Sequence, residues 1–252
     1  MSENERVPMA LYDDPCLFSA YTEMRDLDGR LNDVVETPAL IGLMPALEGI
    51  SAADIGCGIG DMCAWLLDQG AASIVGYDSS GRMLARALDR SPRSEKLRFE
   101  QVPIESIAFP PSGLDLIVSG LALHYIKDFN GLAHRIAQGL RPSGSFIFSI
   151  EHPVVTCSER IWCDCGDKRR AHWPVDAYLD EGERRVRWLG LDQVPRQHRT
   201  VSSYINALLD AGLIVRRVLE PGPDSDAIAR WPRLADQRRR PPFLVIRADK
   251  PA

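Results

Sequence analysis

The turn that follows the first strand pattern constrains the fold of this chain more than any other segment. A short apolar stretch ends in Asp54, glycines follow as Gly56, Gly58 and Gly60, and a helical pattern begins directly afterwards. Glycines at this spacing let the backbone turn sharply from a strand into a helix and lie close against a ligand. The segment therefore predicts an α/β fold with a ligand site at the turn.

Acidic side chains around this turn indicate the charge of the ligand. A dinucleotide-binding turn has its third glycine three residues after the second, and Asp61 occupies that position here. Asp54 and Asp61 would place negative charge on both sides of a pyrophosphate, which is unfavourable in a partly dry site. S-adenosylmethionine has a sulfonium, an ammonium and no phosphate. The turn therefore favours this cationic nucleoside over a nicotinamide dinucleotide.

A second acid supports a nucleoside site. Residues 73–78 have the pattern of a short strand that ends in Asp78. This acid comes about 20 residues after the turn, the spacing at which a second-strand carboxylate accepts hydrogen bonds from ribose hydroxyls. The turn alone is compatible with a tight bend that binds nothing, but the two features together favour a bound nucleoside.

These two motifs resemble motif I and the second-strand acid of the class I S-adenosylmethionine-dependent methyltransferases. Further segments resemble a bacterial small-molecule branch of that superfamily, so the similarity extends over nearly the whole chain. These segments are Tyr12–Pro15, Ser119–Asp128, Phe148–Pro153, Trp173–Tyr178 and His198–Thr200. The resemblance implies a Rossmann-like, doubly wound, mainly parallel seven-stranded sheet with an antiparallel last strand. It also implies an N-terminal helical cap and an insertion after strand five.

Strand and helix patterns alternate along the chain as such a fold requires. We expect one methyltransferase domain over 1–252, with a helical cap (1–50), a cofactor-binding core (51–151), a substrate-covering insertion (152–198) and a C-terminal part (199–252). The expected strands are 51–55, 73–78, 97–101, 114–119, 145–150, 213–218 and 243–247. The expected helices are 14–28, 36–48, 61–69, 80–90, 129–140 and 200–211, with Thr37 and Thr200 as N-caps.

Ligands of open α/β sheets bind beyond the carboxyl ends of the strands, which selects the candidate cofactor residues. Asp54 and the glycine turn are expected to hold the methionine part of the cofactor, and Asp78 its ribose. The family contacts adenine at the place of Ile104 and Glu105, but its usual preceding acid is here Pro103, which lacks a carboxylate and a backbone donor. The complete expected set is Tyr12, Tyr21, Arg25, Asp54, Gly56, Cys57, Gly58, Gly60, Asp78, Ser79, Met83, Ile104, Glu105, Ser119, Gly120 and Leu121.

Methyl transfer from a sulfonium is an in-line displacement on carbon that leaves S-adenosylhomocysteine, and positioning supplies much of its rate. A base is needed only where the acceptor must lose a proton. His124 follows strand four, Glu151 and His152 follow strand five, and with Tyr21 they are the candidate catalytic residues. A structural hydrogen bond explains His124 equally well, and a capping or lid role is favoured for His198.

Residues 152–198 interrupt the regular pattern, and we interpret them as an insertion that covers the substrate, with or without small strands of its own. Trp162, Trp173, Tyr178 and Trp188 would wall an aromatic pocket or pack the inside of a cap. With two candidate histidine bases, this composition favours a small aromatic or heteroaromatic acceptor, methylated at O, N or ring carbon.

Composition disfavours several other classes. The net charge of −5 argues against a nucleic-acid partner, and no apolar run approaches the roughly 18 residues of a membrane helix. The polar N-terminus does not resemble a targeting signal, so we expect a cytoplasmic monomer or homodimer. The cysteines are expected to be free thiols. Cys157, Cys163 and Cys165 lack the usual spacing of zinc ligands even with His152 and His172 nearby, so no metal is expected.

Two alternatives remain open at this point. A protein or RNA methyltransferase would show a basic groove and usually an appended binding module. A protein that binds S-adenosylmethionine without transferring a methyl group would share the glycine turn but yield no S-adenosylhomocysteine. Residues 119–122 lack the Asn/Asp-Pro-Pro-aromatic motif of the DNA-adenine and glutamine N-methyltransferases, which weakens both of those assignments.

Overall fold

A seven-stranded sheet forms the centre of the protein in a computed structural model, which describes residues 11–159, 162–165 and 169–252. The strand order is β10-β11-β5-β4-β1-β2-β3. Strands β1 to β5 pair in parallel, whereas β11 runs antiparallel to both β5 and β10. The strands are β1 Ser51–Ile55, β2 Ser73–Asp78, β3 Leu97–Gln101, β4 Leu114–Gly120, β5 Leu140–Glu151, β10 Ile214–Leu219 and β11 Phe243–Asp249. The predicted Rossmann-like topology, with its antiparallel last strand, is confirmed.

Helices cover both faces of this sheet. On one face, α5 and α7 bury side chains such as Leu132 and Tyr204 against Phe146 and Phe148 of β5. On the other face, Leu40 of α2 and Leu66 of α3 belong to a second apolar cluster. The α-helices are α1 Pro15–Arg25, α2 Thr37–Ile41, α3 Asp61–Asp68, α4 Gly81–Arg90, α5 Phe129–Gly139, α6 Pro153–Thr156, α7 Val201–Asp210 and α8 Ser225–Arg230. The 3-10 helices are η1 Leu11–Asp13, η3 Ile104–Ser106, η4 Leu123–Tyr125 and η5 Pro232–Arg238, and η2 Asn32–Glu36 is a π-helix.

The helix predicted for 36–48 is wrong in extent. The observed helical stretch begins earlier, in the π-helix η2, continues as α2 and ends at Ile41, because Gly42 ends the helix and Pro45 prevents its continuation. Thr37 is not an N-cap, since its hydroxyl donates to Glu36 Oε2 and the chain is already helical on its N-terminal side. Thr200 caps α7 as predicted, by accepting a hydrogen bond from the Ser203 amide.

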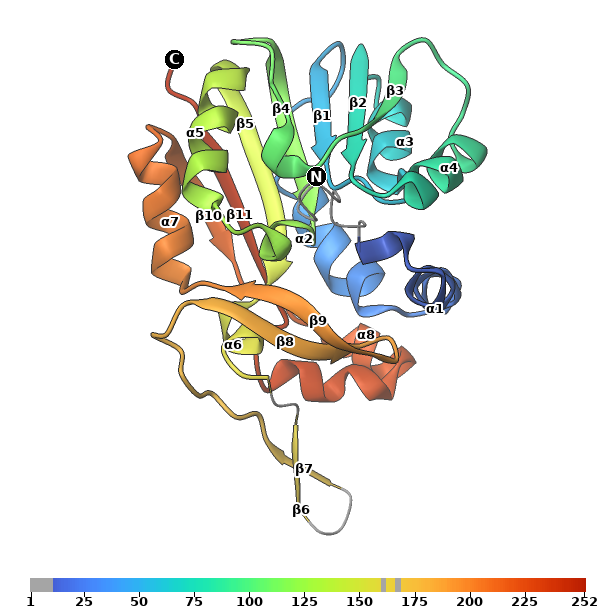
Figure 1. Cartoon of the computed structure of the whole chain (residues 1–252), viewed down its shortest axis with the longest axis vertical. Coiled ribbons are helices and arrows are strands. Elements are labelled where there is room, and N and C mark those ends of the chain that lie inside the picture. Colours follow the sequence, from blue (N-terminus) through green and yellow to red (C-terminus); the bar gives the residue numbers. More distant parts are fainter. Residues whose placement is uncertain (1–10, 160–161, 166–168) are drawn as a thin grey trace, which may run out of the picture.

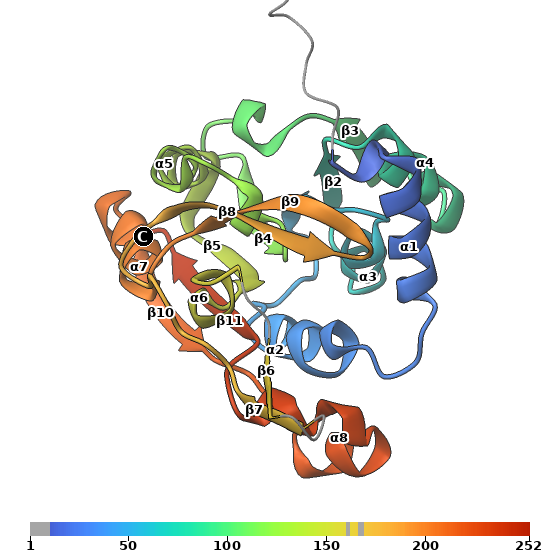
Figure 2. The ribbon, with the colours of Figure 1, turned by 60° about the horizontal axis from the view of Figure 1, so that its bottom comes forward.

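The insertion after β5 folds into two hairpins. Its strands are β6 Cys163–Cys165 with β7 Arg169–His172, and β8 Gly182–Trp188 with β9 Leu191–His198. Strand β8 alternates between half-buried and exposed side chains, as expected where one face of a hairpin lies on the protein. Figure 1 shows that α1, α2 and hairpin β8–β9 all lie at the carboxyl end of the parallel strands, opposite the C-terminus of the chain. In Figure 2, the hairpin crosses in front of these strand ends, with α1 on one side and α7 on the other. None of the described helices has both the length and the apolar character needed to cross a membrane.

Candidate methyl-donor and acceptor site

The glycine turn after β1 adopts the conformation that its sequence predicts. Gly56, Gly58 and Gly60 all have positive φ angles, of 76°, 54° and 82°. A Cβ added at Gly56 would lie 2.3 Å from the Ala122 Cβ, whereas one added at Gly58 would meet no atom within 4 Å. The turn is therefore packed against the chain after β4 on one side and borders open space at Gly58. This open side is where a ligand can approach the backbone.

Asp78, at the end of β2, holds the turn in place. Its Oδ2 accepts a hydrogen bond of 2.8 Å from the Gly58 amide, and its Oδ1 accepts one of 2.8 Å from the Ser80 amide. Each carboxylate oxygen has a second lone pair for a ribose hydroxyl. Asp13, which the sequence did not single out, accepts a 2.6 Å hydrogen bond from the Ser80 hydroxyl and thereby joins η1 to this edge of the site.

Asp54 is a buried acid with little to neutralise it. Only 2% of the residue is exposed, and the single hydrogen bond of its side chain to a described residue comes from Cys63 Sγ, at 3.4 Å. Burial is the main cause that raises the pKa of Asp54 to about 7; the Cys63 hydrogen bond opposes this rise, and the charges of Asp78 and Glu36 add to it. The thiols of Cys57 and Cys63 are in hydrogen-bond contact beside it. A buried carboxyl in this state is complementary to a cationic group.

Helix α1 covers the outer side of the glycine turn. Arg25 forms an ion pair with Asp61 at the start of α3, and Arg90 approaches the same carboxylate at 3.3 Å. Tyr21 lies on the same helix, and burial raises the pKa of its hydroxyl to about 12. Arg25 therefore ties α1 to the residue that directly follows Gly60 of the turn.

The candidate adenine side is less complete. Ile104 is buried close to Gly56, but its carbonyl accepts a hydrogen bond from Arg135 Nη2 at 3.3 Å. Glu105 is exposed, Met83 is buried, and the Ser79 carbonyl accepts from Gln101 Nε2 at 3.1 Å.

At the end of β4 the predicted residues serve mainly to shape the backbone. The Ser119 hydroxyl donates to the Ile55 carbonyl at 2.7 Å and so ties β4 to β1. Leu121 has a positive φ of 53°, and its amide donates to Ser149 Oγ at 3.1 Å. Ser149 in turn donates to Glu36, a 4% exposed carboxyl beside Gly120. Burial raises the pKa of Glu36. No motif points to this acid, because it precedes the strands and reaches the site only through the fold.

A cluster of aromatic and charged side chains lies between hairpin β8–β9 and the ends of β4 and β5. Arg196 of β9 is 2% exposed, and its Nε donates to Glu151 Oε2 at 2.9 Å. Its guanidinium lies 4.5 Å from the centroid of the Tyr125 ring and 5.4 Å from that of Trp188. The Tyr125 hydroxyl is 3.0 Å from the Tyr12 hydroxyl. We call these five residues the β9 cluster.

His124 borders the β9 cluster and is held as a neutral ring. Its Nδ1 accepts a hydrogen bond from the Glu151 amide at 3.4 Å, so the proton lies on Nε2, which is 3.9 Å from Glu151 Oε2. Burial lowers the pKa of His124 to about 4. Burial also acts to raise the pKa of Glu151, but His124 and Arg196 outweigh it and lower that pKa.

Two histidines that follow β5, His152 and His198, have both ring nitrogens engaged by the protein. His152 Nδ1 accepts from the Val154 amide and caps α6, while its Nε2 lies 2.8 Å from Glu220 Oε1. His198 bonds the Thr156 hydroxyl and the Tyr178 carbonyl, each at 2.9 Å. This geometry favours structural roles for His152 and His198.

The aromatic residues of the insertion do not form one wall. Trp162 packs edge-on against Trp173, Tyr178 packs against His198, and Trp188 joins the β9 cluster. Among the described residues, no group of three or more metal-ligating side chains is assembled. The Cys165 side chain, one of the cysteines considered as a zinc ligand, lies outside the described residues.

Comparison with known proteins gives a consistent assignment. Residues 53–148 match the family model described as a methyltransferase domain. An S-adenosylmethionine-dependent methyltransferase from Mesorhizobium loti is 37% identical, with a TM-score of 0.80, and the match covers 85% of this chain and 97% of that one. A structure from Listeria monocytogenes assigned to the same class is 38% identical, with a TM-score of 0.81, over 86% and 97% of the two chains. The chain belongs to the class I S-adenosylmethionine-dependent methyltransferases.

A more distant relative of this methyltransferase has a stated substrate. A trans-aconitate 2-methyltransferase from Deinococcus radiodurans is 34% identical over 128 residues, which cover 50% of this chain and 47% of that protein. The similarity thus extends over about half of each protein.

The residues around the turn fit the cofactor of this methyltransferase family. The buried Asp54 carboxyl makes no ion pair with a described residue and suits an ammonium or sulfonium, and the open side of Gly58 admits a ligand against the backbone. Asp78 retains lone pairs for ribose hydroxyls.

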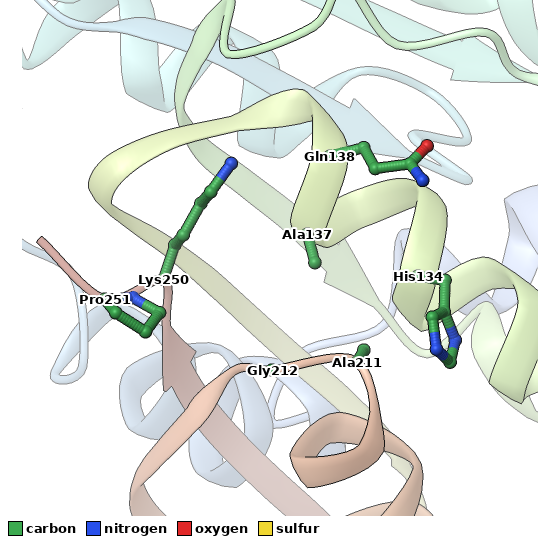
Figure 3. A pocket seen from close by; sticks show the side chains of 7 residues that line it. All are labelled: His134, Ala137, Gln138, Ala211, Gly212, Lys250 and Pro251. Atoms are coloured by element: carbon green, nitrogen blue, oxygen red, sulfur yellow. The ribbon is translucent and has the colours of Figure 1, made fainter.

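One surface hollow of the methyltransferase, of about 360 Å³, is lined by His134, Ala137, Gln138, Ala211, Gly212, Lys250 and Pro251. Figure 3 shows it between the last turns of α5 and α7 and the C-terminal residues. These segments precede β5 and β10 or follow the antiparallel β11, so the hollow is at the amino edge of the sheet, away from the glycine turn.

Proposed function

We propose that this methyltransferase acts on a small molecule bound at the β9 cluster, between hairpin β8–β9 and the glycine turn. One observation carries the proposal: polar side chains buried under the hairpin lie beyond the ends of β4 and β5, next to the strand ends that bear the cofactor motifs. Ligands of open α/β sheets bind at this edge. The cofactor supplies an electrophilic methyl group on a sulfonium, and the chain's own residues hold and orient the acceptor and exclude water.

We further propose that Asp54, the glycine turn and Asp78 hold the cofactor, with Tyr21 and Arg25 closing the site from α1. The similarity to a trans-aconitate methyltransferase supports a small acceptor. A protein or RNA acceptor would need an open surface that accommodates a long chain. Arg196 is instead buried, with only 2% of the residue exposed. The predicted histidine base finds less support, because His124 keeps its proton on the nitrogen that faces Glu151.

The experiment compares three acceptor pools with cofactor carrying a labelled methyl group: the low-mass filtrate of a bacterial extract, its total protein, and its total RNA. We expect label to enter the low-mass fraction alone, together with release of S-adenosylhomocysteine. Calorimetry with S-adenosylhomocysteine establishes in parallel that the cofactor site is intact. Label in protein or RNA would overturn the proposed acceptor class, and tight cofactor binding without labelling of any pool would contradict transfer to a cellular acceptor.

Histidine variants refine the mechanism in the same assay. We expect His124→Gln to lower turnover by less than about tenfold, since a general base typically contributes a factor of 10² to 10⁴. A loss of 10² or more at unchanged cofactor affinity would restore His124 as the base.

A further inference from the structure

The β9 cluster retains hydrogen-bond donors for which the described part of the chain offers no acceptor. Arg196 donates through Nε to Glu151 and through Nη1 to the Pro195 carbonyl, and Nη2 makes no hydrogen bond to a described residue. The Trp188 Nε1–H beside it is buried and likewise has no partner within the described part of the chain. Unused donors in a buried place cost free energy until a ligand or water accepts from them.

The tyrosine pair adds a third donor. One hydroxyl of Tyr12 and Tyr125 donates to the other across 3.0 Å, and the accepting hydroxyl keeps its own proton for a further partner. A guanidinium, an indole N–H and a phenol O–H thus lie together in the β9 cluster. This set of donors matches a group rich in acceptor oxygens and offers little to an ammonium.

Among the described residues, this place offers no unengaged strong proton acceptor. The Glu151 carboxylate is engaged by Arg196, and the neutral His124 presents its N–H toward that carboxylate. Burial raises the pKa of both Tyr12 and Tyr125, so their hydroxyls stay protonated near neutral pH. A phenol or a protonated amine would need a base here, whereas a carboxylate oxygen is already a nucleophile.

From this juxtaposition we infer that the acceptor is a small carboxylic acid, held through its carboxylate by Arg196 with Trp188 and a tyrosine hydroxyl, and converted to its methyl ester. The inference rests on the proposed function, because it assigns the acceptor of the same site. The new bond joins a carboxylate oxygen to the methyl carbon, and the carbon–sulfur bond breaks with its electron pair on sulfur. The negative carboxylate and the positive sulfonium become two neutral groups, and no proton is released.

Burial under the hairpin favours such a reaction. Opposite charges approach one another more readily in a medium of low dielectric constant, and a step that cancels them needs little reorganisation of water. The role of Arg196 is to bind and orient the anion. Its ion pair with Glu151 keeps the guanidinium fixed between two rings before the acceptor arrives.

The chemical class of the product provides the first test. Purified protein and labelled cofactor are incubated with three acids (fumarate, citrate and benzoate), with the amine benzylamine, with phenol, and with the low-mass filtrate of a bacterial extract. Methyl esters release labelled methanol in mild alkali, whereas N-methyl amines and aryl methyl ethers do not. We expect alkali-labile label from the filtrate and from at least one of the acids. Label that withstands alkali would overturn the carboxylate assignment and leave the proposed small-molecule transfer intact. No label from any acceptor, with cofactor binding preserved, would contradict the proposed function itself.

Arg196→Lys is the second test, since lysine keeps the charge beside Glu151 and removes the planar fork. For the acid that is methylated, we expect KM to rise at least tenfold, with kcat within about threefold and cofactor affinity unchanged. Arg187→Gln is the matched control, because Arg187 lies on β8 of the same hairpin with 76% of its side chain exposed. An unchanged KM in Arg196→Lys, or an equal effect in Arg187→Gln, would remove Arg196 from acceptor binding.

Discussion

Gly56 is a residue at which the fold tolerates a side chain poorly. Its φ of 76° disfavours any L-residue, and an added Cβ would overlap the Ala122 Cβ at 2.3 Å. Left-handed backbone costs about 1–2 kcal/mol, and forcing a methyl group into a packed place costs about 1–3 kcal/mol more. We therefore expect Gly56→Ala to lower the free energy of unfolding by about 2–5 kcal/mol, measured by urea denaturation without cofactor.

Gly49→Ala separates the two costs of that substitution. Gly49 has nearly the same φ, 77°, but no atom lies within 4 Å of the position that an added Cβ would take. We therefore expect Gly49→Ala to lower the free energy of unfolding by only the cost of the left-handed backbone, about 1–2 kcal/mol. An equal loss in the free energy of unfolding in Gly56→Ala and Gly49→Ala would show that the chain after β4 moves aside at little cost. The turn would then be less tightly packed than the structure indicates.

His152 is expected to matter for stability and little for catalysis. Asparagine is a good N-cap, so His152→Asn should change the free energy of unfolding by less than about 0.5 kcal/mol, whereas His152→Ala should lose about 1 kcal/mol. The loss follows from the Val154 amide, which would be left without its side-chain acceptor. Both variants should methylate at the rate of the unchanged protein, when rates are normalised to the folded fraction. A hundredfold fall in rate in His152→Asn would instead show that the ring takes part in the reaction.

Local spacing was sufficient to predict part of the candidate site. The glycines, Asp54 and Asp78 sit at fixed distances from strand ends, and backbone geometry makes those distances meaningful. Arg196 and Glu36 obey no such spacing. One comes from a hairpin and the other from a helical turn before β1, and they reach the strand ends only through tertiary packing.

At the scale of elements, hairpin β8–β9 was the hardest to predict. Its strand β8 reads Gly-Glu-Arg-Arg-Val-Arg-Trp, in which charged residues occupy both faces and only two large apolar residues appear. Strand β9 contains Pro195, which usually argues against a strand but is tolerated here because the hairpin has only two strands. Strands β4 and β5, by contrast, contain apolar runs buried on both faces, and the predicted strands 114–119 and 145–150 lie within them.

The hairpin should be separable from cofactor binding. It supplies Arg196 and Trp188, whereas the glycine turn and Asp78 belong to β1, β2 and α3. We expect replacement of residues 184–196 by a short Gly-Ser linker to leave S-adenosylhomocysteine affinity within about fivefold and to reduce methyl transfer more than a hundredfold, since positioning supplies much of the rate. Calorimetry and the labelled-methyl assay measure the two effects. Transfer that persists at a similar rate would place the acceptor elsewhere.

At the scale of the whole molecule, two buried groups give opposite pH dependences to stability. The pKa of Asp54 is raised from 3.8 to about 7, so the folded state holds this proton more tightly and stability falls as pH rises between those values. The pKa of His124 is lowered from 6.5 to about 4, so the unfolded state binds that proton more tightly and stability falls as pH drops through the same range. Each shift corresponds to about 3–4 kcal/mol, and between pH 4 and 6.5 the two effects oppose one another.

Single variants should expose this balance. Asp54→Asn removes the group whose ionisation opposes folding, so its free energy of unfolding relative to the unchanged protein should rise by about 3 kcal/mol between pH 5 and pH 7.5. His124→Gln should do the reverse and gain about 2 kcal/mol, relative to the unchanged protein, as pH is lowered from 7.5 to 5. Urea denaturation at the two pH values measures how the free energy of unfolding of each variant changes with pH. In the double variant, this change should differ from that of the unchanged protein by only about 1 kcal/mol.

Because Asp54 is also the candidate partner of a cationic cofactor, Asp54→Asn should combine its higher stability at pH 7.5 with weaker S-adenosylmethionine binding. If the free energy of unfolding of both single variants changed with pH in parallel with that of the unchanged protein, neither group would be held in the protonation state that its burial imposes.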